Sequence, residues 1–338
     1  MRLPGEKILV VKYSSLGDII NAMPAVRLLK EAGGMDVYWL VKEELAEVLD
    51  CVDFLDGAIL LSKGLGGIRA ASRAAKSIDL TSTVDLMGIF KSGVITYLSG
   101  TSNRISFPHT REFSSIFYNR TMGLDRSTGI HAVRENVSVV EGILGKKFSD
   151  EELDYGIVQD GPSILKAKEL LKSSQKGPLV VINPMTRWPS KVYPKDKFSH
   201  LVRGLTAEGI AVAFVGVGKD KAYIDSIIEG SGSSALNLAG KSDLKTLISI
   251  IKMATMVVSC DSGPMHIASA VDTPVLAIFG PTDPSYTGPF RSNSRVISTM
   301  ESCSPCRKRS CSDRFCMDNI DPESVYGIAM EMIEEYTK

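Results

Sequence analysis

The sequence lacks three features, and each absence excludes a class of protein. No apolar stretch approaches the roughly 20 residues that a membrane-spanning helix requires; the longest covers residues 210–217. No long apolar run precedes a small-residue cleavage site near the N-terminus, so we expect no secretory signal and a cytoplasmic protein. A basic surplus is absent too, because 39 Lys and Arg residues balance 39 Asp and Glu residues. We therefore expect no nucleic-acid partner.

Cysteine is scarce, with six residues in 338. In a reducing cytoplasm these are more typical of thiols or metal ligands than of a disulfide framework. Four follow the spacing C-x2-C-x4-C-x4-C, at Cys303, Cys306, Cys311 and Cys316. This compact set predicts a structural zinc site, although a redox-labile disulfide or free thiols would fit as well. It follows the last expected strand, so we expect it to lie away from the ligand-binding loops.

Apolar, β-branched runs alternate with helical patterns in both halves of the chain. We expect strands at residues 7–12, 36–41, 179–182, 210–215, 256–259 and 274–279. This alternation is typical of parallel βαβ units. The length favours two domains. We predict an N-terminal domain over 1–160, a Gly- and Pro-punctuated linker over 161–178, a C-terminal domain over 179–320 and a final helix over 321–338.

The loops that follow strands are where ligands bind in parallel sheets, because the carboxyl ends of the strands open onto a cleft. In the loop 259–266, Ser262 and Gly263 would begin a helix, whose free N–H groups attract anions, with His266 one turn further on. A plain helix cap explains the same residues. A second such loop at 279–284 makes a diphosphate the better fit.

Two further loops carry groups that could take part in chemistry. Residues 183–191 include Thr186, Arg187 and Lys191, which could neutralise phosphate charge or simply be solvated. Residues 13–18 lack the G-x-G-x-x-G pattern, which disfavours a nicotinamide-dependent oxidoreductase. Asp18 in this loop either caps a helix or accepts a proton from a hydroxyl.

The stretch 61–126 is locally basic, with nine Lys and Arg residues against four Asp and Glu residues. In a neutral protein this favours an anionic ligand or a membrane surface. Arg69 and Arg73 are four residues apart and share a face if the segment is helical. A solvated helix remains the alternative.

Three segments, taken in order, resemble one known family: ILVVKYSSLGD at 8–18, CDSGPMHIASA at 260–270 and FGPTDP at 279–284. They are similar to the ADP-heptose:lipopolysaccharide heptosyltransferases, the ninth glycosyltransferase family, and the match spans nearly the whole chain. Residues 14–18, 84–88 and 115–120 look most like heptosyltransferase I, which adds the first heptose to Kdo–lipid A.

The resemblance implies an α/β fold of the GT-B type, with two Rossmann-like, doubly wound parallel-sheet domains facing across a cleft. It also implies inversion at the anomeric carbon with no metal or other cofactor for catalysis. The acceptor would bind the N-terminal domain and ADP-heptose the C-terminal one. The cysteine cluster occurs only in some relatives, so the shared activity cannot depend on it.

Site roles follow from the resemblance position by position. Asp18 resembles the catalytic base, and Lys191 a catalytic contact to the donor diphosphate. The expected donor-binding residues are Thr186, Arg187, Asp220, Asp261, Ser262, Gly263 and His266. The expected acceptor-binding residues are Ser14, Ser15, Lys63, Arg69, Arg73 and Arg120.

These features together predict an enzyme that moves heptose from ADP-heptose to the lipopolysaccharide inner core at the inner membrane face. A transferase of the same fold with another nucleotide sugar or acceptor is the nearest alternative. A two-domain protein that binds a ligand without reacting is a second alternative.

Overall fold

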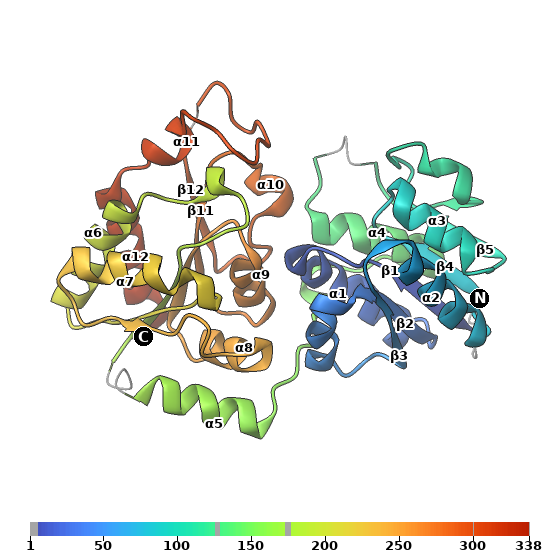
Figure 1. Cartoon of the computed structure of the whole chain (residues 1–338), viewed down its shortest axis with the longest axis horizontal. Helices are drawn as coiled ribbons and strands as arrows, with labels where there is room; N and C mark the ends of the chain where they lie inside the picture. Colours follow the sequence, from blue (N-terminus) through green and yellow to red (C-terminus); the bar gives the residue numbers. More distant parts are fainter. Residues whose placement is uncertain (1–5, 126–128, 173–176, 300, 338) are drawn as a thin grey trace. The chain divides into compact units, whose positions relative to one another are not determined.

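The computed structural model describes residues 6–125, 129–172, 177–299 and 301–337. The chain divides into two compact units, Met1–Val158 and Gln159–Lys338. Each unit holds one six-stranded sheet with helices packed around it (Figure 1). Every strand pair in both sheets is parallel, which confirms the predicted α/β class.

The first unit has the strand order β3-β2-β1-β4-β5-β6, the doubly wound order of a Rossmann-like domain. The strands are β1 (Lys7–Val11), β2 (Asp36–Lys42), β3 (Gly57–Leu61), β4 (Ser82–Asp85), β5 (Asn103–Ser106) and β6 (Arg120–Thr121). The helices are α1 (Leu16–Glu31), α2 (Gly64–Ser77), α3 (Phe90–Leu98) and α4 (Ala132–Leu144), with 3-10 turns η1 (Glu43–Cys51), η2 (Ser114–Phe117) and η4 (Asp150–Glu152).

The second unit repeats this order as β9-β8-β7-β10-β11-β12. Its strands are β7 (Leu179–Asn183), β8 (Ala211–Phe214), β9 (Leu236–Asn237), β10 (Met256–Cys260), β11 (Val275–Phe279) and β12 (Arg295–Ser298). Its helices are α5 (Gly161–Leu170), α6 (Lys195–Ala207), α7 (Lys221–Ser231), α8 (Leu244–Lys252), α9 (Gly263–Ala270), α10 (Pro284–Thr287), α11 (Phe315–Asp318) and α12 (Pro322–Thr337), with turns η6 (Pro189–Lys191) and η7 (Gly218–Asp220).

The central strands are mostly apolar and almost wholly buried because helices cover both faces of each sheet. In the second unit, β7, β10 and β11 are buried at every residue. The winding direction reverses between β1 and β4 in one sheet and between β7 and β10 in the other. Ligands of doubly wound sheets bind beside these reversal points, at the carboxyl ends of the strands.

The first part of the predicted linker over 161–178 forms helix α5. The Asp160 carboxylate caps this helix by accepting from the Ser163 N–H at 2.8 Å. Ion pairs from Lys166 to Asp243 at 2.9 Å and from Lys245 to Asp160 at 3.2 Å tie α5 to α8. The helix therefore belongs to the second unit, and residues 173–176 of the expected linker lie outside the described residues.

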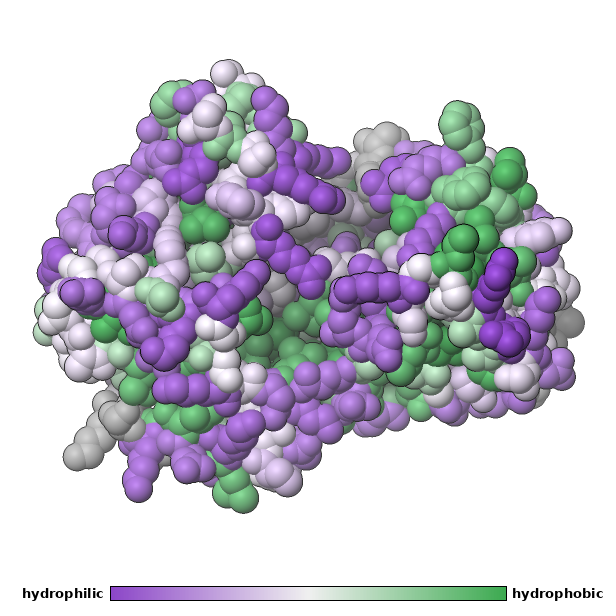
Figure 2. Space-filling view, in the orientation of Figure 1, coloured by the Kyte–Doolittle hydropathy of each residue, from purple (hydrophilic) through white to green (hydrophobic). Residues whose placement is uncertain are grey.

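Helix α12 covers residues 322–337 of the final helix predicted over 321–338. It packs on the second unit's core through Val325, Ala329, Met332 and Ile333. Among the described residues, no helix combines the length and apolarity needed to cross a bilayer. Hydrophilic residues cover much of the face seen in Figure 2.

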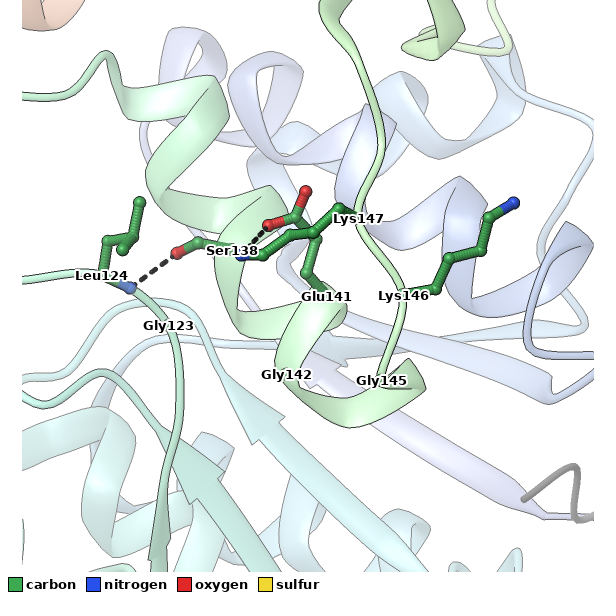
Figure 3. A pocket seen from close by; sticks show the side chains of 8 residues that line it. All are labelled: Gly123, Leu124, Ser138, Glu141, Gly142, Gly145, Lys146 and Lys147. Carbon is green, nitrogen blue, oxygen red and sulfur yellow. Dashed lines mark hydrogen bonds and ion pairs between the residues drawn. The ribbon is translucent and has the colours of Figure 1, made fainter.

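A recess of about 300 Å³ lies at the C-terminal end of α4 (Figure 3). Its lining includes Glu141, whose carboxylate is 1% exposed and contacts Lys147 at 2.8 Å and Arg134 at 3.2 Å. It also accepts from the Phe148 N–H at 3.0 Å. The carboxylate is thus fully engaged within the unit, and we interpret it as a structural anchor for the chain after α4.

Burial raises the pKa of Glu141, but the hydrogen bonds from Lys147 and Phe148 and the Arg134 charge outweigh burial and hold that pKa below its usual range. The ionised Glu141 side chain therefore contributes its full stabilisation of the folded protein above the unfolded-state pKa of about 4.3. This contribution is lost as the pH falls through the folded-state pKa of Glu141.

Glu141→Gln should lower the free energy of unfolding by about 1–3 kcal/mol at pH 7, because charged hydrogen bonds are lost. The deficit should shrink as the pH falls below about 4, where the wild-type carboxylate is itself protonated. Urea denaturation at both pH values measures this. Glu169→Gln, at an exposed position of α5, is the control. A deficit that does not change with pH would contradict the electrostatic role.

Candidate active site

The first candidate site lies where the second sheet reverses its winding, after β7, β10 and β11. The Lys191 ammonium lies 2.5 Å from Asp261 Oδ2, and the Thr282 hydroxyl donates to the same oxygen at 2.6 Å. The two charged side chains are only 14% and 8% exposed. Lys191 also sits 4.4 Å from the ring centroid of Trp188. The Asp261 carboxylate therefore links three loops, and the Lys191 cation is held between this carboxylate and the Trp188 ring.

The N-terminus of α9 adds a second centre of positive potential. Ser262 is the N-cap residue in an extended conformation, but its side chain makes no capping hydrogen bond. Its hydroxyl instead accepts from Asn183 Nδ2 at 2.7 Å and donates to the Cys260 carbonyl at 3.1 Å. The first N–H groups of the helix, from Gly263 onward, are therefore not capped by Ser262. Such an N-terminus attracts an anion.

The other expected donor residues differ in position. His266 is buried in α9, while Arg187 is exposed in the loop after β7. The Thr186 hydroxyl donates to the Trp188 carbonyl at 2.7 Å and accepts from the Trp188 N–H at 3.0 Å, so it shapes the loop. Asp220 is buried and accepts from the Val217 N–H at 3.0 Å, where it caps η7.

Three residues of this site were not predicted individually: Asn183, Trp188 and Thr282. All lie in the post-strand loops that the sequence singled out, so their position in the loops was a usable signal. The roles of these residues could not be predicted, because Asn183 and Ser262 are 79 residues apart and meet only in the folded sheet.

The cysteine loop, residues 303–316, corrects another expectation, since it does not lie away from the anion-binding loops. Ser190 donates its hydroxyl to the Lys308 carbonyl at 2.6 Å. The Arg307 N–H donates to the Pro281 carbonyl at 2.7 Å. The Arg309 guanidinium lies 5.5 Å from the Trp188 ring centroid. The loop therefore braces both loops that carry Lys191 and Thr282, through contacts between residues distant in sequence.

The structural zinc site predicted on the four thiols of this loop stays a prediction. Among the described residues, no group of three or more His, Cys, Asp or Glu side chains is arranged to hold a metal ion. All four cysteines are free; Cys316 is buried, while Cys303 and Cys311 are exposed. Burial and the three neighbouring cysteines raise the pKa of the Cys316 thiol.

The second candidate site lies at the winding reversal of the first sheet. Asp18 is exposed in the first turn of α1. Its Oδ2 accepts from the Ser15 N–H and the Ser15 hydroxyl, both at 2.8 Å. This is a capping box, so the structural role of Asp18 is present. Its exposure leaves the carboxylate accessible to a substrate, so capping and proton transfer are compatible.

A buried carboxylate, Asp85, was missed beside this loop, although it lies in the motif at 84–88. It accepts from the Met87 N–H at 2.8 Å, the Gly88 N–H at 3.1 Å and the Tyr118 hydroxyl at 2.7 Å. Burial raises its pKa. The Thr96 hydroxyl of α3 also donates to it at 3.4 Å. Because its partners are the loop itself, Thr96 and Tyr118, we interpret Asp85 as a residue that fixes the loop after β4.

The expected acceptor cations are exposed in the first unit. Arg69 and Arg73 project from α2, and Arg120 lies on the short strand β6. Lys63 lines a cavity of about 600 Å³ together with Lys42 and Lys91, and with Glu43 and Glu44. Lys42 and Lys91 were not predicted as site residues; Lys42 ends β2, and Lys91 lies in the first turn of α3. Arg126 of the basic stretch lies outside the described residues.

The chain is similar to known proteins of one family. A family model described as "Glycosyltransferase family 9 (heptosyltransferase)" matches residues 68–315. "Lipopolysaccharide heptosyltransferase 1" of Campylobacter coli is 26% identical over 96% of this chain and 98% of its own length.

Two solved structures share the fold. A glycosyl transferase of family 9 from Veillonella parvula has a TM-score of 0.85 and 22% identity, covering 99% of both chains. The ADP-heptose lps heptosyltransferase II of E. coli has a TM-score of 0.80 and 21% identity, covering 97% of this chain and 99% of its own.

Lys191→Met should lower the free energy of unfolding by about 3 kcal/mol, because it leaves the buried Asp261 carboxylate without its cation. Lys191→Met with Asp261→Asn should regain most of this loss, since no unpaired charge remains. Chemical denaturation measures all three proteins.

The matched control for this cycle is Lys166→Met, which breaks the half-exposed pair with Asp243 and should cost less than about 1 kcal/mol. A double variant no more stable than Lys191→Met would show that the ion pair does not set the stability of this site.

Proposed function

The chain belongs to glycosyltransferase family 9 (heptosyltransferase), and from this membership we propose that it transfers a heptose from ADP-heptose to the inner core of lipopolysaccharide. The observation that carries the proposal is the anion site of Lys191, Thr282 and the α9 N-terminus, which lies inside the matched range. ADP-heptose bears a diphosphate, and this site offers one held cation and one helix N-terminus to it.

Lys191 has the central role in leaving-group stabilisation. When the bond to the anomeric carbon breaks, negative charge develops on the ADP diphosphate. A cation fixed by Asp261 needs no reorganisation to meet that charge, and positioned charge of this kind is a large term in catalysis. Lys191 and the α9 N–H groups thus supply the stabilisation that a metal ion would otherwise provide, so we infer metal-independent transfer.

Asp18 supplies the other half of the reaction. Its exposed carboxylate takes the proton from the acceptor hydroxyl, the oxygen attacks the anomeric carbon, and ADP leaves from the opposite face. This single displacement inverts the anomeric configuration. Asp18 then holds the proton that the hydroxyl has lost, as a general base does.

The acceptor binds to the first unit through its cations. Kdo carboxylates and lipid A phosphates are anionic, and Lys42, Lys63 and Lys91 surround one cavity there. Arg69, Arg73 and Arg120 add exposed charge on the same unit. Lipid A is embedded in the inner membrane, so the enzyme works as a peripheral protein on its cytoplasmic face. The likeness to heptosyltransferase I favours Kdo–lipid A, without heptose, as the acceptor.

The test is a panel of nucleotide sugars incubated with heptose-free lipopolysaccharide, with products identified by mass. The proposal expects a heptose-sized mass increase with ADP-heptose alone, with or without EDTA. Transfer of another sugar would favour the alternative transferase of the same fold. No transfer with any donor, despite tight ADP-heptose binding, would favour a ligand-binding protein.

Asp18→Asn should lower kcat by about 10²-fold or more, since general-base catalysis contributes 10²–10⁴-fold. The fold should survive, because the amide oxygen can still accept from Ser15. Steady-state kinetics with the amount of folded protein checked by circular dichroism measures the effect.

Glu152→Gln is the control for Asp18→Asn, since Glu152 forms the same capping box with Ser149 in the same unit. Equal losses of kcat in the two variants, or a near wild-type kcat for Asp18→Asn, would show that Asp18 acts only as a helix cap.

Replacing Arg69 and Arg73 together by Ala should raise the acceptor KM by about 10-fold at low salt and weaken its salt dependence, because each charge near an anionic surface contributes on the order of 1 kcal/mol. The KM for the donor should stay constant. Varying each substrate in turn measures both constants, with Lys172→Ala plus Lys252→Ala as the charge-matched control. A rise in both KM values would assign the arginines to folding.

A further inference from the structure

The first unit exposes a group of large apolar side chains that no step of the proposed reaction uses. We call this group the apolar ridge; it comprises Phe90, Tyr97 and Leu98 of α3 together with Phe113 and Ile116 at η2. Their exposed fractions are 48%, 57%, 36%, 89% and 73%. Figure 2 shows apolar residues gathered over the part of the first unit where Figure 1 places α3. Contiguous exposed apolar surface marks an interaction site more often than scattered residues do.

The ridge is continuous because α3 and η2 pack on each other. The Phe117 ring lies 5.4 Å from the Phe90 ring and 6.2 Å from the Tyr97 ring, centroid to centroid. Gly93 permits this approach, since a Cβ there would lie 2.5 Å from the Phe117 ring. Phe117 thus joins the two elements from beneath, and the outer side chains form one surface.

The backbone before η2 is held in a costly conformation that exposes Phe113. Glu112 and Phe113 have φ angles of 55° and 58°, in the left-handed region that non-glycine residues avoid. The turn is fixed by the Ser114 hydroxyl, which donates to the carbonyls of Gly88 at 3.1 Å and Arg111 at 2.7 Å. Strain of this kind persists where the surroundings impose it, and it concentrates at functional positions.

The segment that carries the ridge is rich in basic residues. Residues 90–120 contain four basic side chains, Lys91, Arg104, Arg111 and Arg120, and one acidic side chain, Glu112. The Arg104 guanidinium lies 5.5 Å from the Tyr97 ring centroid. The Glu112 carboxylate is engaged, since it accepts from the Phe90 N–H at 3.1 Å at the start of α3. The surface therefore combines exposed aromatic rings with a net positive rim.

We propose that the apolar ridge inserts into the interfacial region of an anionic lipid bilayer, with the surrounding cations on the headgroups. Aromatic and aliphatic side chains bind at this depth, and each nearby cation adds attraction to anionic lipid. A second copy of this chain fits less well, because it would bring two positive rims together. The inference rests on the proposed function in one respect, which is that the acceptor of the proposed reaction lies in a membrane.

Vesicle flotation tests the proposal with the full-length chain. Wild type should bind phosphatidylcholine vesicles containing phosphatidylglycerol more tightly than pure phosphatidylcholine vesicles. Phe113→Asp with Ile116→Asp should weaken binding by at least 10-fold, and Arg104→Gln with Arg111→Gln should reduce the preference for anionic lipid. Leu165→Asp, at a 68% exposed position of α5 in the second unit, should bind like wild type.

A second measurement does not depend on comparing the stability of variants. In Phe113→Trp the new indole should shift its fluorescence to shorter wavelength when anionic vesicles are added, because it enters the bilayer. No shift, or unchanged flotation of the Phe113→Asp, Ile116→Asp variant, would overturn the proposal.

Two other binding partners of the ridge would give different experimental results. If ultracentrifugation shows a dimer that the double Asp variant abolishes, while vesicle binding is unchanged, the ridge is a subunit interface. If the KM of the double Asp variant is raised only for acylated acceptor in detergent, the ridge binds the acyl chains of the acceptor. Either of these two results overturns bilayer docking. Activity on a deacylated acceptor should be the same in wild type and variant. If the protein transfers no heptose but still binds vesicles through the ridge, the proposed function is refuted and the proposal of bilayer binding stands.

Discussion

The ion pair between Lys191 and Asp261 is the constraint on which the candidate donor site depends. It joins the loop after β7 to the loop after β10, the two strands between which the sheet reverses its winding. Thr282 ties the loop after β11 to the same carboxylate. Because three loops converge on one buried oxygen, the cation has little freedom. A preorganised cation of this kind is what a developing diphosphate charge requires.

The two units share one strand order and differ in the chemistry placed at its reversal point. In the second unit, the loops supply a fixed cation and an uncapped helix N-terminus, which suit an anionic leaving group. In the first, they supply the accessible Asp18 carboxylate and a cavity lined by lysines. Fold alone does not separate these roles, since both sheets are wound alike; the residues of the post-strand loops do.

The sequence predicted the elements whose signals are local. Runs such as residues 256–259 and 274–279 became the buried strands β10 and β11, because uninterrupted β-branched apolar residues favour central parallel strands. The loops after these strands were predicted to bind an anion because ligands bind at the carboxyl ends of parallel strands, and the donor roles came from the family resemblance.

Features that depend on distant contacts could not be predicted in this way. Helix α5 is held to α8 by ion pairs with residues about 80 positions further along the chain, and the sequence did not indicate this contact. The cysteine loop was placed away from the site, because only the fold brings Lys308 to Ser190. Lys42 and Lys91 line one cavity although they are 49 residues apart. In each case the missing information is three-dimensional proximity.

The most direct test of the account is a crystal structure of the protein with ADP bound. The account predicts that the diphosphate lies within hydrogen-bond distance of the Lys191 ammonium and of the first backbone N–H groups of α9, with Asp261 still in contact with Thr282. A diphosphate bound elsewhere, with Lys191 paired to Asp261 alone, would contradict it.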